Sequence, residues 1–319
     1  MRVFKDTGEY RDFFKNEGKK SPSAAVTIGK FDGIHSGHKK LIETLIENSS
    51  KKDLKTLLFT FDKPFSAYFS GKDTEVLTTN PEREEYLRDK GIDYLLEYPL
   101  RKDTVGISAA DFVEEILIKT LNTKLVAAGP DMSFGRGGEG TIDFLRSVSK
   151  GRFEVIEVPK VKYEGETVSS SLVRDMLKEG DMEMVSILLS RPYSLTGKVT
   201  RGKRLGKSVL EMPTINIYPE KNKLLPPFGV YYSRTVVGTE KINSITNIGR
   251  RPTVEKEGAV NAETFLYGFQ DDLYGETVRI DLLHFEREEK AFSDLNELKE
   301  AMRTDAYAGE RYFKELREE

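Results

Sequence analysis

"GKFDGIHSGHKKLI" spans Gly29 to Ile42 and decides how the first half of the chain is interpreted. It follows an apolar run, Ala24 to Ile28, and leads into an apolar pattern with helical spacing. The chain has 3 histidines, and two of them, His35 and His38, stand three residues apart here. An apolar run that ends in a glycine-rich turn before a helix predicts a strand–turn–helix unit of an α/β domain.

The same alternation continues through the first half of the chain. Continuous apolar strands that alternate with helices predict a parallel sheet covered on both faces. Pro81 suits a first helical turn, and Ser108 suits the cap of the helix that follows it. The predicted strands are Ala24–Ile28, Thr56–Phe61, Tyr94–Leu96, Lys124–Ala128 and Phe153–Val158, and the predicted helices are His38–Glu47, Pro81–Lys90, Ala109–Leu121 and Ile142–Lys150.

The pattern changes after Gly180. One helix precedes this glycine and a short one, Met184 to Leu189, follows it. Six runs of period two then extend from Tyr193 to about Phe285, and a helix is predicted from Asp294 to Lys314. Short alternating runs separated by Gly, Pro and Asn predict a small closed antiparallel barrel. The predicted domains are therefore 1–183 and 184–319.

Composition sets the broad class of protein. A chain of 319 residues is long enough for two domains with separate cores. Its net charge of -3 and pI of about 5.9 argue against a general nucleic-acid binder. The absence of cysteine excludes a disulfide framework and a thiolate nucleophile. The charged N-terminus and the lack of a long apolar run predict a cytoplasmic protein without a membrane partner.

The turn around the two histidines has the properties of a phosphate site. Ligands of open α/β sheets bind beyond the carboxyl ends of the strands, where this turn lies. Gly29, Gly33 and Gly37 allow close approach of the backbone, and the N-terminus of the helix offers free N–H groups. His35 and His38 would hold phosphate oxygens and stabilise charge that grows during nucleotidyl transfer. A surface turn is the alternative, and a metal site is disfavoured because no third ligand is nearby.

This stretch resembles the HxGH-type nucleotidylyltransferases, which are relatives of the class I aminoacyl-tRNA synthetase catalytic fold. That superfamily carries a second signature, a serine-rich turn with a basic residue that grips the triphosphate. "VSSSLVR" matches it with Ser169, Ser170 and Ser171 before Arg174. Hydroxyls and N–H groups at a helix start, backed by a guanidinium, suit β- and γ-phosphates. Three serines before a helix are also compatible with a simple cap.

An ordered set of further segments narrows the resemblance to the prokaryotic bifunctional riboflavin kinase/FAD synthetases. These segments are "AAGPDMSFGRGGEG", "EGDMEMVSILLSRPYSLTGKV", "MPTINI", "ITNIGRRPTV", "DLYGE" and "REEKAFSDLNELKEAM", and the similarity runs from about Val26 to Arg311. The resemblance implies a Rossmann-like adenylyltransferase domain followed by a six-stranded antiparallel β-barrel kinase domain with a C-terminal helix. It also implies that riboflavin is phosphorylated by ATP to FMN, and that FMN is adenylylated by a second ATP to FAD and pyrophosphate.

The resemblance assigns roles in the first domain. His35, His38 and Arg174 are the implied catalytic residues. Asp32 is implied at a phosphate-bound Mg²⁺ or in holding the loop, and a turn-forming aspartate is equally compatible. The expected nucleotide or flavin contacts are Gly29, Phe31, Asp32, Gly33, Gly129, Asp131, Phe134, Gly135, Ser170 and Ser171.

In the second domain the riboflavin 5′-hydroxyl must lose a proton, which a nearby carboxylate can accept. Glu263, in "NAETFLYGF", matches the family's base, although an outward polar residue on an alternating strand would look the same. Thr214 and Asn216 match the residues that serve Mg²⁺ and the ATP phosphates, and oxygen ligands suit Mg²⁺. Arg287 is a further expected cofactor contact. The basic run "KVTRGKRLGK" would neutralise triphosphate or form a solvated hairpin edge.

The kinase half departs from the family pattern. Glu211 stands where the family has a glycine, the loop from Gly206 is one residue longer, and Phe265 and Gly268 replace a histidine and an acidic residue. A carboxylate near ATP phosphates repels them unless a cation intervenes. Two alternatives therefore remain: an FMN adenylyltransferase with a weak or inactive barrel, and a non-catalytic flavin-binding regulator. The expected partners are the small molecules ATP, FMN and riboflavin, with the chain a monomer or weak homo-oligomer.

Overall fold

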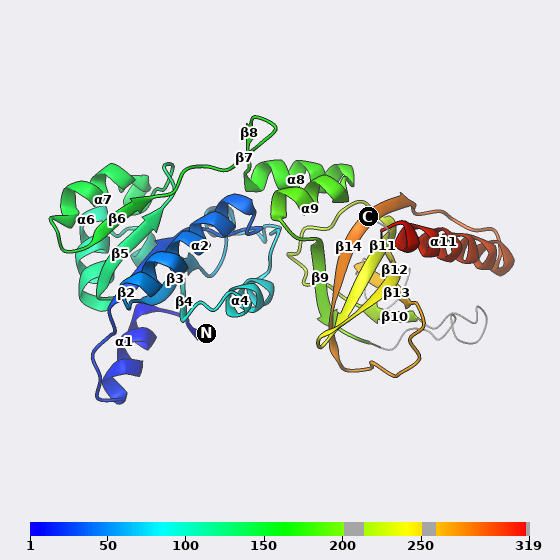
Figure 1. Cartoon of the computed structure of the whole chain (residues 1–319), viewed down its shortest axis with the longest axis horizontal. Helices are drawn as coiled ribbons and strands as arrows, with labels where there is room; N and C mark the ends of the chain where they lie inside the picture. The colour runs from blue at the N-terminus through cyan, green and yellow to red at the C-terminus, as the bar shows by residue number, and fades with distance from the viewer. Residues whose placement is uncertain (201–213, 251–259, 317–319) are drawn as a thin grey trace. The chain divides into compact units, whose positions relative to one another are not determined.

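The computed structural model describes residues 1–200, 214–250 and 260–316. The chain divides into two compact units, Met1–Ser170 and Ser171–Glu319 (Figure 1). This division lies before the predicted boundary at 183/184, because helices α8 (Ser170–Glu179) and α9 (Met182–Leu189) fall largely in the second unit. The division into domains 1–183 and 184–319 stays a prediction.

The first unit contains a six-stranded parallel sheet in the order β1-β4-β3-β2-β5-β6. The predicted parallel sheet is confirmed, and each predicted strand is present with ends shifted by at most two residues. Helices flank these strands in Figure 1. The strands are β1 (Arg2–Phe4), β2 (Ala24–Ile28), β3 (Lys55–Phe61), β4 (Tyr94–Tyr98), β5 (Thr123–Ala128) and β6 (Glu154–Glu157).

The helices of this unit begin where the sequence signals place them. Thr79 and Glu82 form a capping box with Pro81 at the start of the helix, and Ser108 Oγ accepts from Asp111 N at 3.1 Å. The predicted helix 109–121 is instead a short α-helix that continues as a π-helix. The elements are α1 (Thr7–Asn16), α2 (Ser36–Lys51), α3 (Phe65–Ser70), α4 (Asn80–Asp89), α5 (Lys102–Val105), α6 (Ala109–Asp111), η1 (Phe112–Thr120), η2 (Arg136–Gly138), α7 (Ile142–Ser149) and the hairpin β7 (Lys162–Tyr163) and β8 (Glu166–Thr167).

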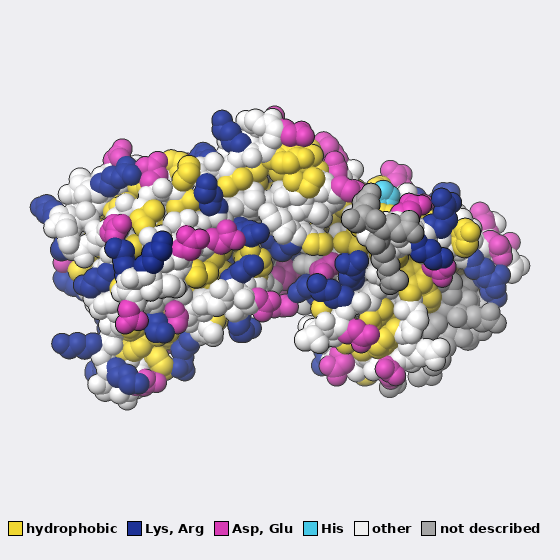
Figure 2. Space-filling model, viewed as in Figure 1, with side chains coloured by type: hydrophobic (Ala, Val, Ile, Leu, Met, Phe, Trp, Pro, Cys, Tyr) yellow, Lys and Arg dark blue, Asp and Glu magenta, His cyan; other side chains and the backbone are white. Residues whose placement is uncertain are grey.

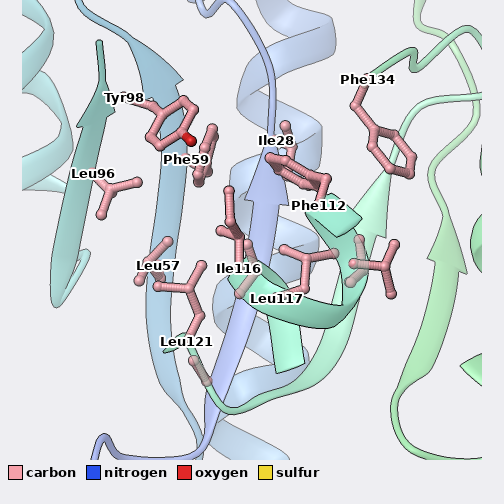
Figure 3. Packing of buried hydrophobic residues seen from close by; sticks show 14 of the residues in the cluster. Ile28, Leu57, Phe59, Leu96, Tyr98, Phe112, Ile116, Leu117, Leu121 and Phe134 are labelled. Carbon is pink, nitrogen blue, oxygen red and sulfur yellow. The ribbon is translucent and has the colours of Figure 1, made fainter. Parts of the chain in front are cut away.

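Two apolar cores cover the two faces of the sheet. One joins β2, β3 and β4 to α1, η1 and α7, and Figure 3 shows Phe59, Phe112 and Phe134 within it. The other joins the opposite faces of these strands to α2 and α4. Each strand is therefore apolar on both sides, which explains its continuous apolar sequence. The second of these cores, which joins the sheet to α2, fixes the first turn of that helix at the carboxyl edge of the sheet.

The second unit is a six-stranded antiparallel sheet in the order β10-β13-β12-β11-β14-β9. A bridge between Thr200, beyond β9, and Asn216 on β10 brings its two edges together. The predicted antiparallel barrel and C-terminal helix are confirmed. The elements are β9 (Tyr193–Lys198), β10 (Thr214–Ile217), β11 (Gly229–Val237), β12 (Glu240–Arg250), β13 (Val260–Leu266), β14 (Thr277–Glu288) and α11 (Leu295–Glu315).

The inner face of this sheet carries a chain of buried hydroxyl groups. Ser233 Oγ lies 2.9 Å from Ser244 Oγ and 2.8 Å from Thr246 Oγ1. Thr235 donates to Ser244 at 2.9 Å, and Thr246 and Thr264 are 2.9 Å apart. All five side chains are 0% exposed. Each hydroxyl therefore depends on its neighbours for the hydrogen bonds that water would supply outside.

Helix α11 covers part of the outer face, where Phe313 packs on Val230, Tyr232 and Ile245. Among the described residues, no helix has the length and apolar character needed to cross a membrane. Figure 2 shows basic and acidic side chains interspersed over the visible face.

Candidate active sites

The turn between β2 and α2 has an unusual backbone. Phe31 and Ile34 have φ of 49° and 42°, and Gly33 between them has φ of 84°. A β-branched residue rarely adopts this left-handed conformation, and such a residue costs on the order of 1–3 kcal/mol. Both apolar side chains are 0% exposed, so core packing holds the strained backbone in place. The turn is thus a rigid structure at the carboxyl edge of the sheet.

The two histidines lie together on this turn, as the sequence predicts. Their rings stack at 4.0 Å between centroids, and the Phe31 ring lies 5.1 Å from that of His38. His35 caps α2 by accepting from the backbone N–H of Gly37 at its Nδ1, over 3.2 Å. Because Nδ1 accepts, the proton of neutral His35 is on Nε2, which is a donor. A Cβ on Gly37 would lie 3.0 Å from the ring of His35, so this glycine makes room for it.

Asp32 ties the turn to two other segments. Its Oδ1 accepts from the backbone N–H groups of Leu77 at 2.7 Å and Thr78 at 3.2 Å. Its carbonyl oxygen accepts from Ser170 Oγ at 2.8 Å. The structure therefore brings Ser170 of the serine signature against the histidine turn, across 138 positions of sequence. The carboxylate of Asp32 holds the loop, which supports the loop-holding alternative for this residue.

Two further residues of the serine signature, Ser171 and Arg174, belong to the second compact unit. Ser171 and Arg174 lie in the first turns of α8, and Ser171 is exposed while Arg174 is partly buried. Hydroxyl and guanidinium groups at a helix start suit phosphate oxygens. Their action on a triphosphate stays a prediction.

The "GPDMSFG" loop gives mixed results for the predicted ligand contacts. Gly129 directly follows β5 at the carboxyl edge of the sheet, and Asp131 pairs with Lys160 at 3.0 Å. Phe134, however, is 6% exposed and packs on Phe112 in the core, at 5.2 Å between ring centroids (Figure 3). A Cβ on Gly135 would lie 2.7 Å from the backbone of Ala109. The structure thus gives Phe134 and Gly135 packing roles, and their predicted ligand contacts lack geometric support.

In the second unit, the predicted kinase residues meet on the outer face of neighbouring strands. Thr214 Oγ1 donates to Glu263 Oε1 at 2.7 Å. Asn216 lies directly opposite Glu263 in the β10–β13 register, and its side chain is 1% exposed. Because Glu263 accepts the Thr214 proton, the lone pairs of the Thr214 hydroxyl point away from the carboxylate. Glu263 therefore presents a carboxylate and orients a neighbouring oxygen.

Two asparagines of this site were not predicted. Asn247 on β12 pairs with Glu263 from the other side, and Asn261 Nδ2 donates to Asn216 Oδ1 at 2.9 Å. The signal for Asn261 was its position two residues before Glu263, since alternate residues of a strand share a face. The register that places Asn247 joins separate strands and cannot be read from a local pattern.

Arg287 has a different surrounding from the one expected of a cofactor contact. Its Nε and Nη2 donate to the two carboxylate oxygens of Asp305 at 3.0 and 2.6 Å. The hydrogen bond to Asp305 raises the pKa of the Arg287 guanidinium. This bidentate pair ties β14 to α11, so the structure gives Arg287 a fold-stabilising role, and its cofactor contact stays a prediction. Gly206, Glu211 and most of the basic run lie outside the described residues.

Metal binding at these sites would depend on few protein ligands. The described ranges contain no group of three or more His, Asp or Glu side chains arranged to hold a metal ion. Thr214, Asn216 and Glu263, which we call the kinase row, do offer a hydroxyl, an amide oxygen and a carboxylate. Mg²⁺ is commonly held by one or two protein oxygens together with substrate phosphates, so these oxygen donors fit it.

Comparison with known protein families agrees with both halves of this description. A family model described as FAD synthetase matches residues 17–172, and one described as riboflavin kinase matches residues 189–313. A bifunctional riboflavin kinase/FMN adenylyltransferase of Escherichia coli K12 is 31% identical, over 90% of this chain and 92% of the relative. One from Bacillus subtilis 168 is 29% identical, over 95% of this chain and 96% of the relative.

A solved structure also shares the fold. The crystal structure of a protein named as a macrolide-efflux protein, from Streptococcus pneumoniae, matches with a TM-score of 0.82 and 24% identity. The match covers 97% of this chain and 98% of that one. At this identity the likeness shows the fold alone.

Proposed function

Since the chain belongs to the family of bifunctional riboflavin kinase/FMN adenylyltransferases, we propose that its two reactions are divided between the histidine turn and the kinase row. The protein is an FAD-synthesising enzyme with both activities. The kinase family model covers the barrel half, so the alternatives of an inactive barrel and of a non-catalytic regulator are not favoured. Riboflavin, FMN and ATP are its substrates.

In the adenylyl transfer, an oxygen of the FMN phosphate attacks the α-phosphorus of ATP. The bond from that phosphorus to the bridging oxygen breaks, and pyrophosphate leaves with the electron pair. The FMN phosphate is already ionised near neutral pH, so positioning and charge stabilisation carry the reaction. The Nε2–H of His35 and the ring of His38 are offered to the phosphates from a turn that core packing holds rigid. Ser170, Ser171 and Arg174 complete the proposed triphosphate contacts.

In the kinase reaction, the oxygen of the riboflavin 5′-hydroxyl attacks the γ-phosphorus of ATP while Glu263 accepts the hydroxyl proton. The bond from that phosphorus to the bridging oxygen breaks, and ADP leaves with the electron pair. Thr214 and Asn216 present oxygens beside the base. Mg²⁺, where bound, supplies charge neutralisation for the phosphates, and Thr214 and Asn216 are its proposed protein ligands. A carboxylate in hydrogen-bond reach of the substrate hydroxyl typically contributes about 10²–10⁴-fold in rate.

The stacked histidine pair at the start of α2 carries the adenylylation half of this proposal. Purified protein with Mg²⁺ and ATP is incubated with FMN or with riboflavin, and flavins are separated by chromatography. His38→Ala should lower FAD formation from FMN by about 10²–10³-fold, the usual cost of losing an electrostatic donor to the transition state. It should leave riboflavin phosphorylation intact, and Glu263→Gln should do the reverse.

Equal loss of both reactions in either variant would contradict the division between two sites. Absence of FAD from FMN with the parent protein would reject the adenylyl-transfer assignment outright. We place the enzyme in the cytoplasm, where ATP is supplied, which fits its bacterial enzyme relatives. A monomer or weak homo-oligomer stays a prediction that sedimentation would test.

A further inference from the structure

Asn261 lies beside the kinase row without a role in the proposal above. It is on β13, two residues before Glu263 and therefore on the same face of the sheet. Asn261 is 6% exposed, although its side chain carries both a carbonyl oxygen and an NH₂ group. A buried amide must find hydrogen-bond partners or lose free energy, so its contacts identify what it does.

Its partner is the amide of Asn216. Asn261 Nδ2 donates to Asn216 Oδ1 at 2.9 Å, and the Asn216 side chain is itself 1% exposed. The main chain of Asn216 is held separately, because its carbonyl oxygen accepts from the backbone N–H of Thr200 at 2.8 Å. With the backbone fixed, the remaining freedom of Asn216 is rotation of its side-chain amide.

That rotation matters because the two ends of an amide are chemically opposite. A half-turn about the last side-chain bond exchanges the oxygen, which accepts, with the NH₂ group, which donates. An NH₂ donor from Asn261 is compatible only with the oxygen of Asn216 on its side. Turning Asn216 over while Asn261 keeps its orientation would set two NH₂ groups against each other in a buried position, which costs the full desolvation of an unmet donor.

We propose that Asn261 is a positioning residue of the riboflavin kinase reaction, which fixes the side-chain amide of Asn216 in the one orientation that serves the ATP phosphates and their divalent cation. This inference rests on the proposed role of Asn216. In the fixed orientation Asn216 Oδ1 keeps a second lone pair for the cation, while its NH₂ group is turned toward the other side. Asn261 itself touches neither substrate nor metal.

The test uses the full-length enzyme and two readouts. Binding of Mn²⁺ in the presence of ADP is followed by the relaxation rate of water protons, which does not require turnover. Riboflavin phosphorylation and FMN adenylylation are measured on the same preparations. The variants are Asn261→Ala, Asn216→Ala and the double variant, with Asn243→Ala as control, because Asn243 is an asparagine of β12 that accepts from Arg234 Nε at 3.4 Å outside this row.

Asn261→Ala should weaken Mn²⁺ binding and lower the kcat/KM of phosphorylation by about 10- to 100-fold, the scale of a small misplacement in an active site. Adenylylation should stay unchanged. In the Asn216→Ala background the same substitution should have no further effect, because Asn261 acts only through Asn216. Asn243→Ala should leave both readouts at the parental level.

Three results would overturn the inference. An unchanged Mn²⁺ affinity and phosphorylation rate in Asn261→Ala would remove the proposed effect. An equal penalty in the presence and absence of the Asn216 side chain would show a packing role. A parental Mn²⁺ affinity in Asn216→Ala would instead reject the proposed role of Asn216, while the division of reactions tested by His38→Ala would stand.

Discussion

Gly37→Ala is the sharpest perturbation of the histidine turn, because it adds one methyl group at a known place. The added Cβ would lie 3.0 Å from His35 Cε1 and 3.1 Å from its Nδ1, inside the 3.4 Å of ordinary contact. The ring must therefore move by a few tenths of an ångström. Because His35 and His38 stack at 4.0 Å, the displacement passes to both rings.

The size of the effect follows from this displacement. A misplacement of about 1 Å in an active site costs on the order of 10²-fold in rate, so we expect a loss of about tenfold in FMN adenylylation. Stability should change little, because alanine in a helix gains up to about 1 kcal/mol over glycine and offsets part of the crowding. Riboflavin phosphorylation should keep its parental rate.

The assay is the initial rate of FAD formation at saturating ATP and FMN, with the thermal midpoint measured on the same sample. Gly106→Ala is the matched control, since its Cβ would have only the carbonyl oxygen of Lys102, at 3.4 Å, as a near neighbour. An unchanged adenylylation rate in Gly37→Ala would refute the reasoning that ring position limits the rate. Equal losses of both activities would point to damage of the whole fold.

Three further predictions concern stability. Arg83→Met leaves the Glu97 side chain, 1% exposed, with the exposed Lys5 as its one remaining charged partner among the described residues. It should lower the free energy of unfolding by about 2–4 kcal/mol in urea titrations, and a loss below about 0.5 kcal/mol would contradict this. Burial opposes ionisation of Asp93, but hydrogen bonds from Thr56 and Lys55 outweigh it and hold the pKa of its carboxyl below the ordinary value. Its carboxylate therefore stabilises the fold above about pH 4 and ceases to do so as the pH falls through its lowered folded-state pKa. The urea midpoints of the parent and of Asp93→Asn should therefore converge in acid. Curves of midpoint against pH that stay parallel for the two proteins would refute this. Asp305→Asn weakens the pair with Arg287 and should lower stability by about 1–3 kcal/mol, with the KM for riboflavin unchanged if Arg287 acts only on the fold.

Much of the fold was predictable because each half has one dominant periodicity. The parallel strands are apolar on both faces, and the barrel strands alternate. The N-terminal β1 and α1 were not predicted, since the few aromatic residues that form their core are spaced among many charged residues. Phe4, Tyr10 and Phe14 contact one another with ring centroids 5.0 and 5.1 Å apart. Single aromatic residues spaced among charges give too weak a local signal for an element.

The residues of the candidate sites were likewise predictable only in part. The histidine pair was predictable because its spacing places both rings at one helix start. Phe134 and Arg287 were assigned from the resemblance to ligand contacts, whereas the structure shows one in the core and the other paired with Asp305. Whether a side chain faces a ligand or a neighbouring element depends on tertiary packing, which a linear pattern does not contain. Asn247 and Asn261 required the strand register.

The hydroxyl chain inside the barrel has a consequence for how this sequence can change over time. Removing one hydroxyl, as in Thr246→Val, strands the donors or acceptors of Ser233 and Thr264 in a place that water does not reach. An isolated replacement is therefore harmful where a joint one is tolerable. Among homologues these five positions should drift together, as a correlated set, while the apolar residues around them are exchanged singly.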